Sequence, residues 1–566
     1  MGWSERADDV PAEYSRSMRI GAWSSAAADD SAARTELTAW WRYAAYAALA
    51  AGAALRIAQY VAHSSLSIDE SFLSLDLLRL SPGDLLGRLD FNQAAPLGFL
   101  EVEKAAVAVF GTSEYALRLL PMLASLLSLP LFYHAAKKLL DNRAVPFACA
   151  AFVLLDPLIY YGATIKQYSF DITAAVALYA VAASIRPGQL RRRQLVKLAV
   201  LGAVIVWLSH ASVFVLAAIA LALTVDAFAH GRSESLRGIA LTIGAWVVSF
   251  ATEVAFSHAN LVSIQSSFAG RGTFLGSGNA GAPTLFDSAT SKARYLVGLE
   301  DTVSGSPILR SLPAGVNQGL TVLLVLVAAT GVLALLRMGR SRTAMLLGLP
   351  PVFVLFAAAL HQYPLVGRTL VFLMPAVALC LGEGMRALVS PSRSGAAYAG
   401  TAVSAVVLVS LALLPAVHLI RPRQGEGIRP ALRDLGSYYR AGDALYVGHS
   451  AQFGVAYYHL CRCAPFDARD GWRFDLTGAP PFGAPAIISR SPALIIGRAS
   501  DSSEIARADW PLLPGRGRVW ILISQTSESE ARPFLAYLDH SGRRVQQFTD
   551  YGPENIGALL YLYDLP

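Results

Sequence analysis

The sequence predicts a multi-pass α-helical membrane protein that carries an α/β domain at its C-terminal end. Its 566 residues are 54% hydrophobic and only 15% charged, whereas soluble proteins average about 25% charged residues. Long apolar runs recur along most of the chain, and a helix needs roughly 20 such residues to cross a bilayer. Arg and Lys gather in every second connection between these runs, which is typical of the cytosolic side of membrane proteins.

Eleven apolar runs are predicted to span the membrane, and together they define a transmembrane module over residues 37–419. The runs are 37–62, 116–136, 144–162, 168–186, 194–209, 211–230, 237–257, 316–337, 343–361, 368–389 and 397–419. Membrane lipids are therefore predicted to surround the module, and no nucleic acid is expected as a partner.

The positions of the basic residues predict the orientation of the module. They cluster after the second, fourth, sixth, eighth and tenth runs, at Lys137, Lys138, Arg143, Arg186, Arg191, Arg192, Arg193, Lys197, Arg232, Arg237, Arg337, Arg340, Arg342, Arg386 and Arg393. Because basic loops stay cytosolic, the N-terminus is predicted to be cytosolic and the C-terminal region to lie outside. Arg421, Arg423 and Arg429 follow the last run and disagree, but long domains cross membranes largely regardless of charge.

The two ends of the chain differ from the module. Residues 1–36 are polar, mixed in charge and lack the apolar core of a cleaved signal peptide, so we expect a disordered cytosolic tail. Residues 420–566 alternate between strand-like and helix-like runs, which predicts an extracytoplasmic α/β domain. The strand-like runs lie at 444–448, 493–497 and 518–524, and a helix-like run lies at 527–542.

The four cysteines are too few for a disulfide framework. Cys149 and Cys380 lie inside apolar runs, where buried thiols are expected. Cys461 and Cys463 are only two positions apart, so a disulfide between them would be strained. We therefore predict no bond between them.

Two outer-face connections are long. Residues 63–115 contain DESFLSLDLLRL and PLGFLEVEKAAVAVFG, in which apolar residues and charges alternate at near-helical spacing. Both segments predict helices that lie in the membrane interface. Residues 258–315 are rich in Gly and Ser and include GRGTFLGSGNAGAP, and a loop of this length is usually functional or disordered.

Two adjacent carboxylates, Asp69 and Glu70, open the segment SIDESFLSLDLL directly after the first apolar run. Their positions fit a helix cap, because Ser67 or Asp69 can accept from the first free amides and Glu70 favours the positive helix end. They also fit a catalytic pair at the outer membrane surface. The segment alone leaves both interpretations open.

Several polar residues are expected at the same outer face. Lys166 and Tyr168 lie in IYYGATIKQYSFDI, Arg368 follows Tyr363 in HQYPLVGRTLVFLMPAVAL, and His210 occupies a tight turn. The two cations suit a lipid phosphate, although Lys166 could simply snorkel, Arg368 could anchor the interface and His210 could be structural. Further candidates inside the apolar runs are Asp156, Asp171, as an ion-pair partner of Lys166, and Glu253.

These residues are predicted to converge on one site, because the runs that carry them all end on the outer face. An acid beside cations is what transfer from a phosphate-linked donor requires. The carboxylate removes a proton from an acceptor hydroxyl, and the cations stabilise the leaving phosphate.

Four segments resemble GT-C integral-membrane glycosyltransferases, above all the group of dolichyl-phosphate-mannose–protein mannosyltransferases and the bacterial lipid A aminoarabinose transferase. IDESF is similar to the acidic motif of the first outer loop of that family. The most specific match is APLGFLEVEKAAVAVFGTSEYALRLLPMLASLL at 95–127, and YYGATIKQYSFD and HQYPLVGRTLVFLMPA match two later segments. The resemblance covers roughly residues 40–390.

The resemblance implies a glycosyltransferase of the bacterial plasma membrane that uses a polyprenyl-phosphate sugar as donor. It implies Asp69 as the base, with Glu70 assisting or holding the outer helices, and Lys166 and Arg368 near the lipid phosphate. The acceptor would be a hydroxyl of a lipid, glycan or protein. Two positions depart from the family, because Lys166 stands where Arg is frequent and Thr369 stands where Tyr is expected.

Two questions stay open in the sequence. No His/Asp ligand cluster is evident, and many members of the family act without a metal, so no cofactor is predicted and a divalent cation is left as an alternative. A multi-pass transporter or lipid flippase is the alternative function, and a membrane scaffold is a third. A transporter predicts internal repeats and broken helices that meet at mid-membrane, and the sequence shows no convincing repeat.

Overall fold

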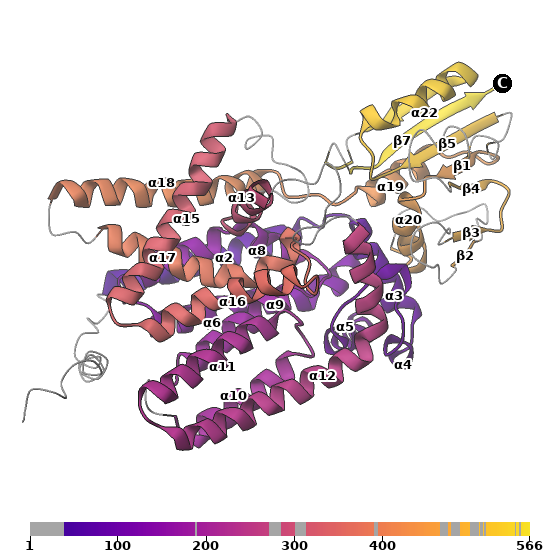
Figure 1. Cartoon of the computed structure of the whole chain (residues 1–566). Coiled ribbons are helices and arrows are strands. Elements are labelled where there is room, and N and C mark those ends of the chain that lie inside the picture. The colour runs from indigo at the N-terminus through magenta and orange to yellow at the C-terminus, as the bar shows by residue number, and fades with distance from the viewer. Residues whose placement is uncertain are drawn as a thin grey trace, which may run out of the picture.

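The computed structural model describes most of the chain and shows a bundle of long helices joined to a smaller domain with a β-sheet (Figure 1). The described residues are 39–186, 190–270, 285–299, 313–389, 394–463, 474–476, 487–497, 509, 513, 517–549, 551–553 and 556–566. The expected tail at 1–36 lies outside them, as does almost all of the Gly/Ser-rich stretch in the loop 258–315.

All eleven apolar runs form helices. In chain order the helices of the bundle are α2 (Ala39–Val61), α6 (Glu114–Leu139), α7 (Val145–Leu154), α8 (Asp156–Tyr160), α9 (Tyr168–Ala182), α10 (Arg192–Ile205), α11 (Ser212–Ala229), α12 (Ser233–Gly270), α15 (Ala314–Arg337), α16 (Ser341–Ala359), α17 (Met374–Val389) and α18 (Ser394–Ile420). Short 3-10 turns η2 (Tyr161–Ala163) and η3 (Gly367–Leu373) precede α9 and α17.

The multi-pass helical fold is confirmed, but fewer helices qualify as spans than the eleven predicted. In the described part of the chain seven helices are long and apolar enough to cross a membrane, or eight if the bent pair α7–α8 counts as one span. Helices α9 and α10 have only 15 and 14 residues, short of the roughly 20 that a bilayer requires. Helix α2 is long enough but carries Arg42 and Arg56. Counting apolar runs in the sequence therefore overestimates the number of full membrane spans.

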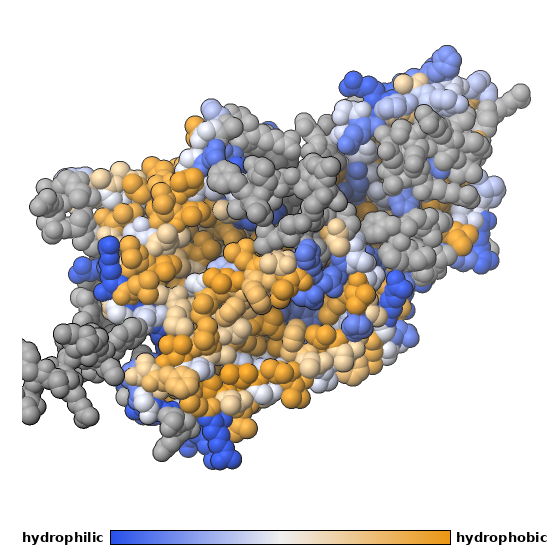
Figure 2. Space-filling model, viewed as in Figure 1, coloured by the Kyte–Doolittle hydropathy of each residue, from blue (hydrophilic) through white to orange (hydrophobic). Residues whose placement is uncertain are grey.

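The surface of the bundle is apolar. Figure 2 shows hydrophobic side chains over the helices and more polar ones over the visible part of the C-terminal domain. Val204 of α10, Val248 of α12 and Phe356 of α16 are all more than half exposed. A broad exposed apolar surface of this kind indicates contact with lipid.

A layer of shorter helices separates the bundle from the C-terminal domain. It comprises α3 (Ile68–Arg79), α4 (Pro82–Leu85), η1 (Asp90–Asn92) and α5 (Leu97–Phe110). The two helices predicted within residues 63–115 are therefore present as α3 and α5. Leu73 and Leu77 of α3 share a buried apolar cluster with Phe453 and Trp520 of the C-terminal domain. The C-terminal domain therefore packs directly on this layer.

The C-terminal region forms a mixed α/β domain, as predicted. Its main sheet has the strand order β4-β1-β5-β7-β6, with β4, β1 and β5 parallel and β7 and β6 antiparallel. The strands are β1 (Ala444–Val447), β4 (Leu494–Ile496), β5 (Gly517–Ile523), β6 (Arg543–Phe548) and β7 (Leu559–Leu565), and a separate pair is formed by β2 (Phe474–Leu476) and β3 (Ile487–Ser489). Its helices are α19 (Ile428–Tyr438), α20 (Ala451–Leu460) and α22 (Glu528–Ser541), and α13 (Leu285–Leu296) packs on η3 of the bundle.

The prediction for the cysteines of this domain is wrong. Cys461 and Cys463 are joined in a disulfide, while Cys149 and Cys380 are free and buried as expected. Arg462 between the bonded cysteines has a positive φ of 52°, which turns the chain sharply. The two Cα atoms come to 5.2 Å, inside the usual range for a disulfide, so spacing in the sequence was a poor guide.

Candidate active site

Helix α3 begins with the cap that its sequence predicts. The Ser67 hydroxyl accepts from the Glu70 amide at 3.4 Å, and the Glu70 carboxylate accepts from the Ser67 amide at 3.0 Å. This reciprocal pair satisfies two amides that have no partner within the helix. The capping interpretation is therefore correct for Ser67 and Glu70.

Glu70 faces away from any cavity and is buried in an ion pair. Arg118 of α6 donates Nε to Oε1 at 2.9 Å and Nη2 to Oε2 at 3.0 Å. The Ile165 amide donates to Oε1 at 3.1 Å. Glu70 thus ties α3 to α6 and to the loop before α9, and both of its oxygens are occupied.

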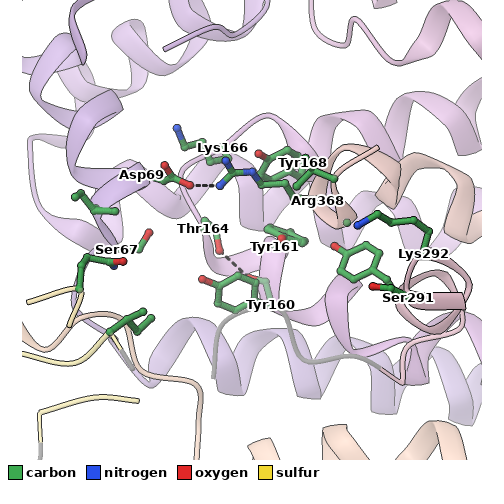
Figure 3. A pocket seen from close by; sticks show the side chains of 16 residues that line it. Ser67, Asp69, Tyr160, Tyr161, Thr164, Lys166, Tyr168, Ser291, Lys292 and Arg368 are labelled. Carbon is green, nitrogen blue, oxygen red and sulfur yellow. Dashed lines mark hydrogen bonds and ion pairs between the residues drawn. The ribbon is translucent and has the colours of Figure 1, made fainter. Parts of the chain in front are cut away.

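The Asp69 side chain points away from that of Glu70. Its side chain is 36% exposed and forms an ion pair with Arg368 of η3. Figure 3 shows the two groups meeting across a cavity, with Lys166 and Tyr168 beside them. Adjacent positions on a helix point about 100° apart, so one carboxylate reaches the cavity while its neighbour is buried.

Lys166 lies in the loop between η2 and α9 and is only 8% exposed. Its ammonium donates to Gln93 Oε1 at 2.5 Å, while Asp171, the partner offered by the sequence, lies on a cavity wall farther into α9. Burial lowers the pKa of Lys166 to about 8, and the nearby Asp69 opposes that shift. The side chain is thus a largely buried cation at the cavity wall, bonded to Gln93 and close to Asp69.

A polar cavity of about 440 Å³ opens on one side of these residues. Tyr160, Tyr161 and Thr164 line this cavity below Asp69 in the view of Figure 3. Lys292 extends from α13 toward Tyr161 and Arg368. Gln525 and Ile556 line it from the C-terminal domain. Hydroxyl, amide and charged groups make this cavity suited to a sugar or another polar group.

A more apolar cavity of about 550 Å³ lies on the other side. Phe72, Phe214, Phe250 and Phe268 are among its walls, and Asp171 lies deeper along it. The two cavities have a common wall made of Asp69, Lys166, Tyr168 and Arg368. We call these four residues the shared wall.

His210 and Tyr363 also line the apolar cavity, but both are engaged with protein. His210 Nε2 lies 2.6 Å from Glu253 Oε2. Glu253 is buried and also accepts from Ser257 Oγ at 2.7 Å and from the Leu97 amide at 3.2 Å. The Tyr363 hydroxyl donates to the Thr369 carbonyl at 2.7 Å, so both side chains brace the cavity wall.

Seven of the ten candidate residues line the apolar cavity, whereas Glu70, Asp156 and Glu253 do not. Local sequence did not reveal Lys292, Gln525 and Ile556, because they come from α13 and from the distant C-terminal domain. It also did not reveal the role of Arg118, although this residue lies inside the distinctive segment 95–127. Among the described residues no three His, Cys, Asp or Glu side chains lie close enough to hold a metal.

Asp156, a candidate in the sequence, forms a second buried ion pair. It pairs with Arg423, and its Oδ1 lies 2.8 Å from His418 Nδ1. Arg429 likewise bonds Glu114 at the start of α6. Two of the three arginines that disagreed with the predicted orientation are therefore neutralised by carboxylates of the helical bundle.

Comparisons with known proteins give structural matches only. No family model and no curated protein matches the chain. The fold is similar to that of ArnT from Cupriavidus metallidurans bound to undecaprenyl phosphate, at 13% identity over 90% of this chain and 96% of that one, with a TM-score of 0.43. It is also similar to the archaeal oligosaccharyltransferase AglB from Archaeoglobus fulgidus in complex with an inhibitory peptide and a dolichol-phosphate, at 11% identity over 88% and 71% of the two chains, with a TM-score of 0.44. These two structural matches, both at low identity, are what the comparisons give for the resemblance to GT-C membrane glycosyltransferases.

Proposed function

We propose that this chain transfers a sugar from a polyprenyl-phosphate donor to an acceptor hydroxyl at the outer face of a bacterial plasma membrane. The observation that carries the proposal is the shared wall. It places one accessible carboxylate and two cations between an apolar cavity and a polar one. An amphiphilic donor needs both environments, with its phosphate at the boundary.

The apolar cavity suits the first isoprene units of the donor, and the polar cavity suits the sugar and the acceptor. The phosphate then lies at Lys166 and Arg368, where charge-assisted bonds are strongest. Arg368 is paired with Asp69 in this structure, and it also has the planar donor set that a phosphate accepts. Tyr168 in the same wall offers a further hydroxyl.

In the proposed reaction Asp69 accepts the proton of the acceptor hydroxyl as its oxygen attacks the anomeric carbon. The bond between that carbon and the phosphate oxygen breaks, and the electron pair leaves with the phosphate. Lys166 and Arg368 stabilise the charge that develops there. A single displacement of this kind inverts the anomeric configuration.

The remaining candidates have supporting roles in this proposal. Glu70 positions Asp69 by fixing the first turn of α3 against Arg118, which is the second of its two predicted roles. His210 and Tyr363 keep the apolar cavity in shape through Glu253 and Thr369.

The test is transfer by the full chain in lipid nanodiscs from a panel of synthetic polyprenyl-phosphate sugars. Wild-type protein should transfer at least one of them, and Asp69→Asn should reduce the rate by about 10²- to 10⁴-fold, the usual contribution of a general base. The matched control is Glu101→Gln in α5, a carboxylate of the same outer segment that does not line either cavity.

Donor binding provides the second measurement, because it should survive the loss of the base. Undecaprenyl phosphate should raise the thermal stability of both wild-type and Asp69→Asn protein. Transfer at the wild-type rate by Asp69→Asn would overturn the assignment of the base, and no binding of a polyprenyl phosphate would overturn the substrate class.

A further inference from the structure

The connection from α18 into the first turn of α19 is fixed at three evenly spaced residues, two of them to the helical bundle and one to α3. We call residues 423–429, RQGEGIR, the strap; it runs from the bundle into the C-terminal domain (Figure 1). Arg423 bonds Asp156 at the bend between α7 and α8, and Arg429 bonds Glu114 at the start of α6. The third fixed residue is Glu426, midway between them.

Glu426 is a buried carboxylate, only 2% exposed, that joins two parts of the molecule. On the side of α3, its Oε1 accepts from the Ile68 amide. On the domain side the same oxygen accepts from Gln525 Nε2 at 2.5 Å, and Oε2 accepts from Ser524 Oγ at 3.3 Å. Its carbonyl accepts from the Ala558 amide at 2.6 Å, so side chain and backbone are both fixed.

Two glycines allow Glu426 to reach this position. A Cβ on Gly425 would lie 2.0 Å from the Ser65 carbonyl oxygen. Gly427 has a φ of +70°, and a Cβ there would lie 1.7 Å from the Tyr551 carbonyl oxygen. The sequence Gly-Glu-Gly therefore lets the strap pass between the first outer loop and the C-terminal domain with a carboxylate directed at α3.

The Ile68 amide is one of those that the α3 cap does not satisfy. The first amides of a helix have no partner within it. Ser67 and Glu70 satisfy each other's amides, and Glu426 satisfies that of Ile68, the residue directly before Asp69. The backbone that carries Asp69 is thus held from the C-terminal domain.

Gln525 extends the same connection into the polar cavity. It follows the carboxyl end of β5 and lines the cavity together with Ile556. In open sheets with parallel strands, ligands bind at the carboxyl ends of the strands. The chain just after the carboxyl end of β5 thus lies at the cavity that Asp69 lines.

We infer that the C-terminal domain completes the active site, with Glu426 as a positioning residue for Asp69 and Gln525 as a specificity-determining residue of the polar cavity. The inference rests on the proposed function of these cavities and adds a component to it. Glu426 acts through the Ile68 backbone and does not touch substrate. Gln525 presents its amide to whatever polar group occupies the cavity.

The first experiment compares kcat and KM of Glu426→Ala with those of wild-type protein, using the full chain in nanodiscs. A misplacement of about 1 Å at a reacting group costs roughly 100-fold in rate, so kcat should fall by about that factor. The KM for the donor should stay nearly constant, because Lys166 and Arg368 lie on other elements. The control is Asp475→Ala, an exposed carboxylate of the same domain that pairs with Arg490 outside the cavities.

The conservative variant Glu426→Gln should restore most of the activity. Burial raises the pKa of Glu426 to about 8, so the group is mostly protonated at pH 7. A Gln side chain keeps an oxygen for Ile68 and Gln525 and places an amide donor opposite Ser524. If Glu426→Gln were as slow as Glu426→Ala, or if Glu426→Ala kept the wild-type kcat, the positioning role would be refuted.

Two further measurements keep the inference testable if Glu426→Ala does not fold or if the donor class is wrong. Gln525→Ala leaves the Ile68 contact intact and should raise the KM of the sugar-bearing substrate about tenfold, the effect of one lost hydrogen bond to a polar ligand group; an unchanged KM refutes its role. Hydrogen exchange needs no substrate, and it should quicken at residues 67–72 in Glu426→Ala but not in Glu426→Gln. Unchanged exchange there would refute the contact even in a protein with another activity.

Discussion

Two groups of charges lie close together at the end of the bundle that meets the C-terminal domain, and they differ in whether a cavity reaches them. Asp69, Lys166 and Arg368 line both cavities. The pairs Glu70–Arg118, Glu114–Arg429 and Asp156–Arg423 lie behind them with nearly every carboxylate oxygen occupied by protein. Both groups are made of the same residue types, so residue type alone does not separate a reactive charge from a structural one.

The difference is sharpest at Asp69 and Glu70, which are neighbours in the chain. Glu70 accepts from five donor groups of Arg118, Ile165 and Ser67, and nothing remains for a substrate. Asp69 has a partly exposed side chain that pairs with Arg368 at the wall of both cavities. A pair of acidic residues at the start of a helix can therefore divide the two tasks that its sequence suggests.

The largest expected effect that tests this comparison is on stability. Glu70→Ala leaves Arg118 buried without its counter-charge, and breaking a buried pair in this way costs about 3–5 kcal/mol. Asp69→Ala should cost less than about 1 kcal/mol, because Arg368 stays hydrated from the cavity. The free energies of unfolding of the two variants, measured with denaturant in detergent, show whether their losses of stability differ in this way.

The double variant Glu70→Gln with Arg118→Met serves as the control for that measurement. Replacing both partners of a buried pair removes the unpaired charge, and such replacements are often nearly neutral. Equal losses of stability for Glu70→Ala and Asp69→Ala would show that the two carboxylates do not differ as described.

The next effect in size is on donor binding. A hydrogen bond to a charged group contributes about 1.5–3 kcal/mol, so Arg368→Gln or Lys166→Met should weaken the binding of undecaprenyl phosphate by roughly 10- to 100-fold. Titration in nanodiscs measures the dissociation constant. Lys197→Met, an exposed cation on α10 that lies on neither cavity, should bind as the wild type does.

Donor binding should also depend on pH through Lys166. Burial lowers the pKa of this ammonium to about 8, below its ordinary value, so the cation is present under pH 7 and is lost as the pH rises through 8. Affinity should therefore fall between about pH 7 and 9, by tenfold at most for one charge-assisted bond. Lys166→Arg, whose guanidinium stays charged, should remove this dependence; a persistent fall would assign it to another group.

The sequence predicted the shared wall better than it predicted the parts around it. Asp69, Lys166 and Arg368 could be placed on one face because apolar runs and basic loops are local patterns that fix topology. The number of spans was overestimated, since α9 and α10 are apolar but too short. The disulfide of Cys461 was missed because the left-handed turn at Arg462 has no signature in sequence spacing.

Contacts over long separations were the main part that sequence could not supply. Ile68 and Glu426 are 358 positions apart, and Arg118 meets Glu70 over 48. Neither periodicity nor composition links such residues. The arginines after the last apolar run gave a hint, because they disagreed with the predicted orientation, and in the structure Arg423 and Arg429 hold the strap to the bundle.

The smallest expected effect concerns His210, which belongs to neither group of charges completely. It lines the apolar cavity as the reactive group does, yet it is paired with the buried Glu253 as the structural group is. Gln can keep a neutral hydrogen bond to that carboxylate, so His210→Gln should change kcat/KM by no more than about 1 kcal/mol, which is roughly fivefold. A loss of about 100-fold with intact stability would mean that His210 contacts the phosphate. The shared wall would then extend along the apolar cavity toward α11. Exposure to a cavity would then identify a reactive charge even where the side chain is paired with another residue.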